Sequence, residues 1–153
     1  MNNITADWLQ AATDDLAAIE AMLPNEQLTN IIAFHAQQAV EKAFKGLREK
    51  FGLRIPRTHD LLVLYDGLSE QIQAAEDTLD SLNELYIDAR YPGDIGLLPH
   101  GKPTTEEARA FYLFAQEIVK TAMKLNQKES EEPPITAPSE HSPSELPPQN
   151  LNP

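Results

Sequence analysis

Apolar residues recur at three- and four-residue spacing along most of residues 8–125, and no segment shows the strict alternation of a strand. This spacing places the apolar side chains on one face of each helix, and that face must pack against other helices. The pattern is interrupted at Pro24, Gly52, Pro92 and Gly93, which are residue types that end helices. The sequence therefore predicts an all-α fold, an antiparallel up-and-down bundle of about five helices.

The apolar stripes and the helix-end signals set approximate bounds for these helices. The five predicted helices cover residues 7–23, 29–51, 58–68, 74–91 and 104–125. Gly52 is the expected stop of the second helix. Thr58 is the expected N-cap of the third, and Thr104 with Glu107 fits a capping box at the start of the fifth.

The composition changes abruptly after the fifth helix. Seven of the twelve prolines lie in residues 133–153, among Ser, Glu, Gln and Asn, with few apolar residues to offset the entropy of ordering. We therefore predict a helical bundle in residues 1–127 and a disordered, acidic, Pro/Glu/Ser-rich tail in residues 128–153. Such a tail could serve as a polyproline ligand, but no PxxP run in it has flanking basic residues.

Charge and composition exclude several classes of function. The formal net charge is −12, of which the tail contributes −4 and the body −8, so general DNA or RNA binding is disfavoured except in a local basic cleft. No run of about 18 apolar residues is present, and the N-terminus lacks a signal pattern, so we expect a cytoplasmic protein without membrane association. The chain has no cysteine, which excludes disulfides and thiolate chemistry.

Polar residues that a plain bundle does not require are the best indication of function. Two helices and the start of a third supply them, and we expect them to form one ligand-binding site: His35, Gln38, Lys42, Arg57, His59, Asn83, Tyr86 and Arg90. His59 is expected beside the free N–H groups of a helix start, which favours anions such as phosphate. Ile31 and Phe34 lie beside these polar residues, which indicates contact with another helix or a second subunit.

A structural interpretation of the same residues remains open. Arg90 would then pair with Asp60, Glu41 or Asp88, Tyr86 would complete a hydrogen bond in the core, and His59 would face solvent.

Several blocks of the sequence resemble the HEPN domain family (higher eukaryotes and prokaryotes nucleotide-binding) over residues 6–126. The blocks are FHAQQAVEKAFKGL, PRTHDL, ELYIDARYPG and TTEEAR. The resemblance implies an all-α bundle that is commonly a homodimer and is often encoded beside a minimal nucleotidyltransferase, in pairs that resemble toxin and antitoxin. Some HEPN proteins are metal-independent ribonucleases with an Arg-x4–6-His motif at the dimer cleft. The resemblance therefore requires that this sequence be checked for the same motif.

That ribonuclease motif is absent after Arg90, where Ile95, Gly96 and Leu97 occupy the positions of the histidine. The spacing from Arg54 to His59 matches the motif, but Pro56 prevents a helix between them. We therefore predict a nucleotide-binding or partner-binding module paired with a minimal nucleotidyltransferase, and no residue is assigned to catalysis.

The first alternative is an endoribonuclease toxin in which Arg90 supplies the cation and His59 or His35 the base. The second is a non-catalytic helical adaptor. No cofactor or metal site is expected, because the histidines lack ligand spacing and no phosphate-binding glycine loop is present. The expected partners are a second copy of the chain, the nucleotidyltransferase, and a nucleotide or RNA held in a local cleft.

Overall fold

The computed structural model describes residues 3–90 and 101–128, with only the backbone of residues 88–90. Five α-helices and one 3-10 turn form this part of the chain, and it contains no strand. They are α1 (Ile4–Met22), η1 (Glu26–Leu28), α2 (Thr29–Lys50), α3 (Leu61–Tyr65), α4 (Glu76–Arg90) and α5 (Thr105–Lys128). The predicted all-α fold is confirmed, whereas the predicted tail lies outside the described residues.

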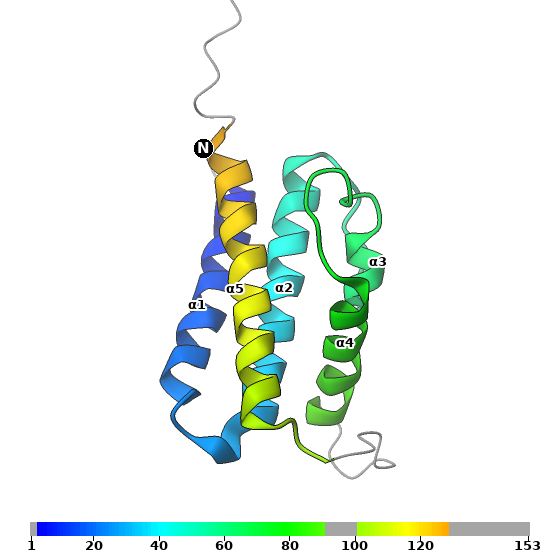
Figure 1. The fold of residues 1–153 in the computed structure, drawn as a ribbon. Helices are drawn as coiled ribbons and strands as arrows, with labels where there is room; N and C mark the ends of the chain where they lie inside the picture. The colour runs from blue at the N-terminus through cyan, green and yellow to red at the C-terminus, as the bar shows by residue number, and fades with distance from the viewer. Residues whose placement is uncertain (1–2, 91–100, 129–153) are drawn as a thin grey trace, which may run out of the picture.

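The second helix, α2, is the centre of the bundle. It contacts α1 and α5 on one side and α3 and α4 on the other (Figure 1). The long helices alternate in direction along the chain, so α1 is antiparallel to α2, and α4 is antiparallel to α5 (Figure 1). The up-and-down arrangement predicted from the sequence is therefore confirmed, and the start of α1 lies near the end of α5.

Helix ends follow the sequence signals at most positions. Gly52 adopts φ +68° directly after α2, and the N–H of Leu53 donates to the carbonyl of Arg48, which closes the helix as a Schellman motif. At the start of α5 the N–H of Glu107 donates to Oγ1 of Thr104 at 3.0 Å, as the capping box predicts.

The third helix differs from its prediction. It is a single short helix that begins at Leu61, and its N-cap is Asp60, whose carboxylate accepts hydrogen bonds from the N–H groups of Leu62 and Val63. Thr58 is therefore not the N-cap, and its hydroxyl instead accepts from the N–H of Asp60. The helix begins after Asp60 because a carboxylate is a better acceptor at a helix start than the threonine hydroxyl.

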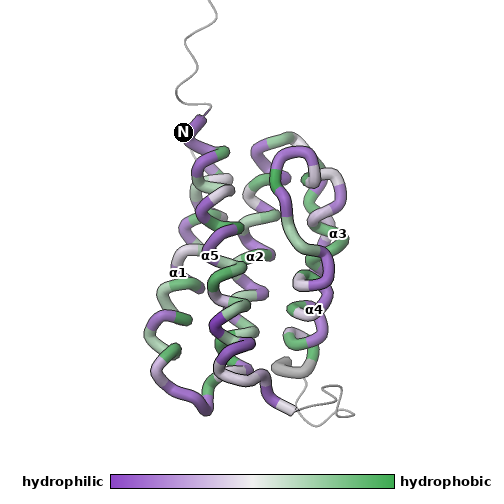
Figure 2. The backbone as a smooth tube through the Cα atoms, in the orientation of Figure 1, coloured by the Kyte–Doolittle hydropathy of each residue, from purple (hydrophilic) through white to green (hydrophobic). Residues whose placement is uncertain are grey.

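One continuous core fills the space between the helices, and each helix alternates apolar and hydrophilic segments around it (Figure 2). Most of the predicted stripe residues are buried in it, including Ile19, Phe44, Leu61, Leu79 and Val119. Among residues 3–90 and 101–128, no helix is long and apolar enough to cross a membrane.

Close approach between α1 and α2 depends on Gly46. A Cβ at this position would lie 3.0 Å from Cβ of Trp8 and 3.4 Å from the carbonyl oxygen of Thr5. The side chain of Lys45 passes over the Trp8 ring, with Nζ 5.7 Å from the ring centroid, and covers the same contact from outside. The α1–α2 spacing therefore has no room for a branched side chain here.

We predict that Gly46→Val lowers the free energy of unfolding by about 1–3 kcal/mol, because the added methyl groups force α1 away from α2. Gly46→Ala should be nearly neutral, since a gain in helix propensity of about 1 kcal/mol offsets the tighter contact. Urea unfolding followed by circular dichroism measures both. Ala110→Val, at an exposed position of α5, is the control for the β-branched side chain, and an equal loss in that variant would contradict the packing argument.

Candidate functional site

Asp15 connects α1 to the polar side of α2. Its carboxylate lies 2.7 Å from Nζ of Lys42 and 2.9 Å from Nδ1 of His35, and its side chain is only 9% exposed. Lys42 and His35 lie two turns apart on α2, so they approach the carboxylate from two directions. Both predicted ligand-binding residues therefore bind an acidic side chain of their own chain.

Glu41 is the centre of a second polar cluster, between α2 and α3. Its carboxylate accepts from Nζ of Lys45 at 2.7 Å and from the amides of Gln37 and Gln38 at 3.1 Å each. Nδ1 of His59 lies 3.0 Å from Oε1 and 3.1 Å from Oε2 of the same carboxylate. Because an ionised carboxylate only accepts, the geometry places a proton on Nδ1 of His59.

The surroundings of Glu41 determine its charge. Burial raises the pKa of the carboxyl, but the hydrogen bonds from Lys45 and His59, the charge of Lys45 and the hydrogen bond from Gln37 outweigh it. The pKa of Glu41 therefore lies below its usual value, and the group is a carboxylate at neutral pH.

Gln37 extends the cluster to the backbone before α3. It is fully buried, and its amide donates to the carbonyl oxygen of His59 at 2.9 Å as well as to Glu41. Its own carbonyl accepts from Gln38 at 2.7 Å. Both the ring and the backbone of His59 are therefore held by α2.

The helix start next to His59 has no free N–H groups for an anion. Asp60 accepts from Leu62 and Val63, and Oδ1 of Asn83 accepts from the N–H of Leu61 at 2.9 Å. The amide of Asn83 also donates to Asp60 at 2.9 Å. The expectation of free N–H groups at this helix start is therefore wrong, because two side chains of the chain itself already accept hydrogen bonds from these donors.

Aromatic rings join the polar cluster to α4. The Tyr86 ring lies nearly parallel to Phe34 at a centroid distance of 5.5 Å and packs on the His59 ring at 5.1 Å. Phe34 also meets the edge of His35 at 5.4 Å. This row of rings is the link between the Glu41 cluster and the Asp15 cluster.

The remaining two predicted site residues are Arg57 and Arg90. Arg57 is exposed and makes no hydrogen bond or ion pair with residues 3–90 or 101–128. Arg90 is the last residue of α4, and its side chain lies outside the described residues. Of the predicted residues whose side chains the structure describes, two lie at Asp15 and two at Glu41, Tyr86 packs on His59, Asn83 binds the start of α3, and Arg57 lies apart.

Sequence reasoning missed two central residues, Asp15 and Gln37, and named Glu41 only as a possible partner of Arg90. Asp15 lies between Ala12 and Ile19 on the buried stripe of α1, so a charged residue at an apolar position was the signal. Glu41 and Gln37 are one turn apart at the edge of the buried face of α2, where a carboxylate needs partners. Residues 3–90 and 101–128 contain no group of three His, Asp or Glu side chains that could hold a metal ion.

We predict that stability falls at acid pH through Glu41. Because its pKa is lower in the folded state than in the unfolded chain, its stabilising contribution is present above the unfolded value, about 4.3, and is lost as the pH falls through the folded pKa. Glu41→Gln should lower the free energy of unfolding at pH 7 by about 1–3 kcal/mol and flatten its decline between pH 5 and pH 3.

Urea unfolding at several pH values measures this effect. Glu84→Gln, at an exposed position of α4, is the control. If both variants keep the wild-type pH profile, Glu41 has no part in acid sensitivity.

Known proteins share both the sequence pattern and the fold. A model of the HEPN domain matches residues 5–126. TT1696 from Thermus thermophilus is 30% identical in sequence and similar in structure, with a TM-score of 0.61 over 80% of this chain and 98% of that chain. An HEPN domain protein from Thermotoga maritima is 25% identical, with a TM-score of 0.57 and the same coverage of both chains. Curated proteins gave no match.

The family match spans all five α-helices up to Asn126. It includes the α2 residues that form the Asp15 and Glu41 clusters. The chain therefore belongs to the HEPN domain family.

Proposed function

We propose that this HEPN domain protein is a partner-binding module that uses the partly exposed side of α2 to bind a second copy of itself and a minimal nucleotidyltransferase. The two proteins would form a pair of the toxin–antitoxin type. The observation that carries the proposal is that buried carboxylates already neutralise the cations on this side of α2.

The neutralisation argues against a polyphosphate as the main ligand. Lys42 and His35 are held by Asp15, whereas Lys45 and His59 are held by Glu41. An incoming phosphate would have to replace a carboxylate as the partner of a cation, and the displaced carboxylate would lose its hydrogen bonds in a buried position. A neutral mixed surface is a better match for another protein.

Apolar side chains complete this surface. Ile31 and Phe34 are only partly buried and lie on the same side of α2 as Gln38 and Lys42. Aromatic and aliphatic side chains surrounded by paired polar groups are typical of the core of a protein interface. Dimerisation and nucleotidyltransferase binding are both compatible with such a surface, and family membership supports both.

We predict that Ile31→Glu and Phe34→Asp weaken self-association and binding of a minimal nucleotidyltransferase by at least about tenfold, which equals ~1.4 kcal/mol. The physical reason is that a charge would be buried in an apolar contact without a partner. Size-exclusion chromatography with light scattering measures the first, and co-elution with the nucleotidyltransferase measures the second.

Leu113→Asp provides the matched control, because Leu113 is 53% exposed on α5, away from α2. Circular dichroism checks that each variant is folded. If the wild type is a monomer that does not bind the nucleotidyltransferase, the proposal fails. Calorimetric binding of a nucleotide that Lys42→Ala or Arg90→Ala abolishes would instead favour a nucleotide-binding module.

One observation favours a second function, metal-independent RNA cleavage. The ring of His59 is oriented by a buried carboxylate through Nδ1, and its side chain is 52% exposed. A histidine oriented in this way is a competent general base for a ribose 2′-OH, since the second ring nitrogen is left to accept the proton. A cation to stabilise the phosphorane would come from Arg57 or Arg90.

For this alternative we predict that His59→Ala reduces RNA cleavage by about 10²–10⁴-fold, because the base is removed. Glu41→Gln should reduce cleavage less, because the ring loses only its orientation. His35→Ala, which removes a histidine of the Asp15 cluster, is the matched control and should cleave normally. RNA that stays intact after prolonged incubation with the wild-type protein would exclude the alternative.

A further inference from the structure

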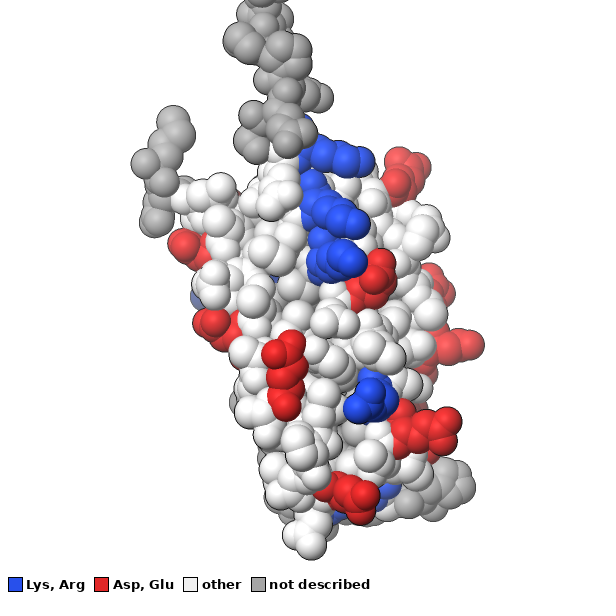
Figure 3. Space-filling view, turned by 60° about the vertical axis from the view of Figure 1, so that its left-hand side comes forward, with Lys and Arg blue, Asp and Glu red and all other residues white. Residues whose placement is uncertain are grey.

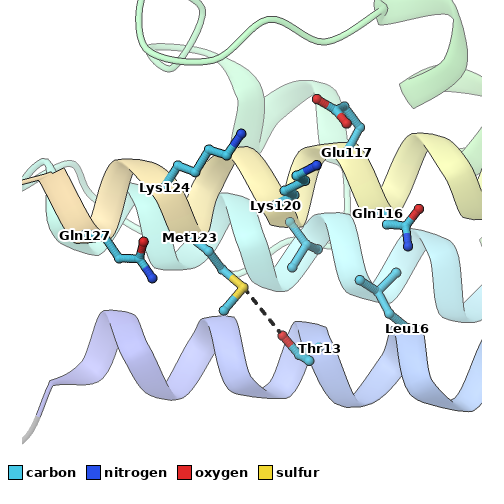
Figure 4. A pocket seen from close by; sticks show the side chains of 9 residues that line it. Thr13, Leu16, Gln116, Glu117, Lys120, Met123, Lys124 and Gln127 are labelled. Atoms are coloured by element: carbon cyan, nitrogen blue, oxygen red, sulfur yellow. Dashed lines mark hydrogen bonds between the residues drawn. The ribbon is translucent and has the colours of Figure 1, made fainter.

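A groove lies between α1 and α5, and all of its described lining residues belong to these two helices. It has a volume of about 500 Å³ and is lined by Thr13 and Leu16 of α1 and by α5 residues between Gln116 and Gln127. Figure 4 shows the Met123 side chain reaching toward α1, where Sδ lies 4.0 Å from the hydroxyl of Thr13. Met123 is 41% exposed, so the groove has an accessible apolar floor.

A row of lysines follows this groove along α5. Lys120, Lys124 and Lys128 lie at four-residue spacing, which places them on one side of the helix, and all three are exposed. They form no ion pair with a carboxylate among residues 3–90 and 101–128. In the space-filling view, basic side chains form a row on this part of the molecule (Figure 3).

The row is a local excess of positive charge in an acidic chain. Residues 118–128 contain three lysines and no acidic residue, although the chain has 24 acidic and 12 basic residues. Among the described lining residues Glu117 is the one carboxylate, and the α1 wall is uncharged. The helix macrodipole stabilises Lys128 in the last turn, but like charges four residues apart repel each other. This surface is therefore complementary to an acidic partner.

The groove residues favour an acidic protein segment over a nucleic acid. None of the nine described lining residues is aromatic or an arginine, whereas single strands are bound by stacking on aromatic rings and phosphates by arginine forks. The floor at Met123 matches an apolar side chain, which a phosphate backbone does not offer. The net charge of −12 also repels a long polyanion more strongly than a peptide with a few carboxylates.

The form of the groove favours a helix as its occupant. Both walls are helices, whose backbone groups are bonded internally, so they present no free edge that could pair with an extended chain. A helical partner satisfies its own backbone groups. The rise from Lys120 to Lys128 is about 12 Å, and carboxylates at four-residue spacing on a second helix have the same rise. Three such carboxylates therefore match the three lysines.

We propose that the α1–α5 groove binds an acidic amphipathic helix of another protein. Its carboxylates pair with Lys120, Lys124 and Lys128, and an apolar side chain beside them packs on Met123. Exposed ion pairs are individually weak, so the apolar contact supplies part of the affinity and the lysines select an acidic sequence. The proposal is independent of the role given to α2, because none of the described groove residues lies on that helix.

Methyl NMR of the full chain tests the proposal, because the chain has three methionines and only Met123 is among the groove residues. The probe is a synthetic helical peptide with glutamates at four-residue spacing on one side and leucines on the adjoining side. We expect it to shift the Met123 methyl signal saturably and to leave the Met22 signal in place. A peptide of the same composition in scrambled order should cause no shift. Binding should weaken at about 1 M salt, where the Debye length is ~3 Å.

Charge reversal separates the groove from general attraction. We expect Lys120→Glu/Lys124→Glu to weaken binding of the peptide by at least about tenfold, measured by calorimetry. Lys102→Glu/Arg109→Glu changes the net charge by the same amount at exposed positions outside the groove, and it should bind within about twofold of the wild type. Circular dichroism checks that both variants are folded.

Three results would overturn the proposal. The first is a Met123 methyl signal that stays unchanged with the peptide at about 1 mM, the range of weak contacts. The second is an equal loss of binding in the groove variant and the control variant. The third is a single-stranded RNA oligonucleotide that shifts the Met123 signal at lower concentration than the peptide, which would assign the groove to nucleic acid.

Discussion

The bundle depends on how closely the other helices pack around α2. A central helix with neighbours on two sides must have small side chains where the backbones approach, and α2 has alanine at positions 33, 36, 39 and 43 and glycine at 46, all of them buried. Larger residues such as Phe44 and Leu47 fill the spaces between these contacts. The polar residues of α2 are thereby confined to the one narrow side that neither α1 nor α5 fully covers.

Two buried carboxylates make that polar side stable. Asp15 from α1 and Glu41 from α2 are each nearly inaccessible to solvent. Asp15 meets Lys42 and His35, whereas Glu41 meets Lys45, His59 and two glutamine amides. A buried carboxylate without these partners would be costly, so the cations and the acids require each other. The same pairs fix the position of α1 and of the segment before α3 along α2, because Asp15 of α1 pairs with His35 and Lys42 of α2, and His59 pairs with Glu41 of α2.

Local signals in the sequence were enough to predict the helices. The apolar spacing and the helix-end residues Gly52 and Thr104 are signals that involve only a few neighbouring residues. They were enough to predict the fold class and most of the helix ends. The exception was Thr58, because Asp60, two residues later, is the better acceptor and caps α3 instead. The Arg90 side chain lies outside the described residues, so its place stays a prediction.

The candidate site was harder to predict, because its partners are distant in sequence. His35 and Lys42 were predicted to be site residues from the sequence, but their partner Asp15 lies 20 and 27 residues away from them. The spacing of residues along one helix cannot show which residue of another helix will face a given polar side chain. The sequence therefore identified half of each pair, and the structure was needed to find that the other half is an acid of the same chain.

The short helix α3 has a consequence for how this region folds. Five residues are too few to form a helix in isolation, because the conformational entropy lost in ordering the first turn exceeds the stabilisation from its few hydrogen bonds. The start of α3 is closed by Asn83 of α4, and the backbone before it is held by Gln37 of α2. Residues 58–65 thus acquire their shape only after α2 and α4 have come together, and they would be among the last to form and the first to open. His59 is carried on this late-forming unit, so its orientation reports whether α4 is docked.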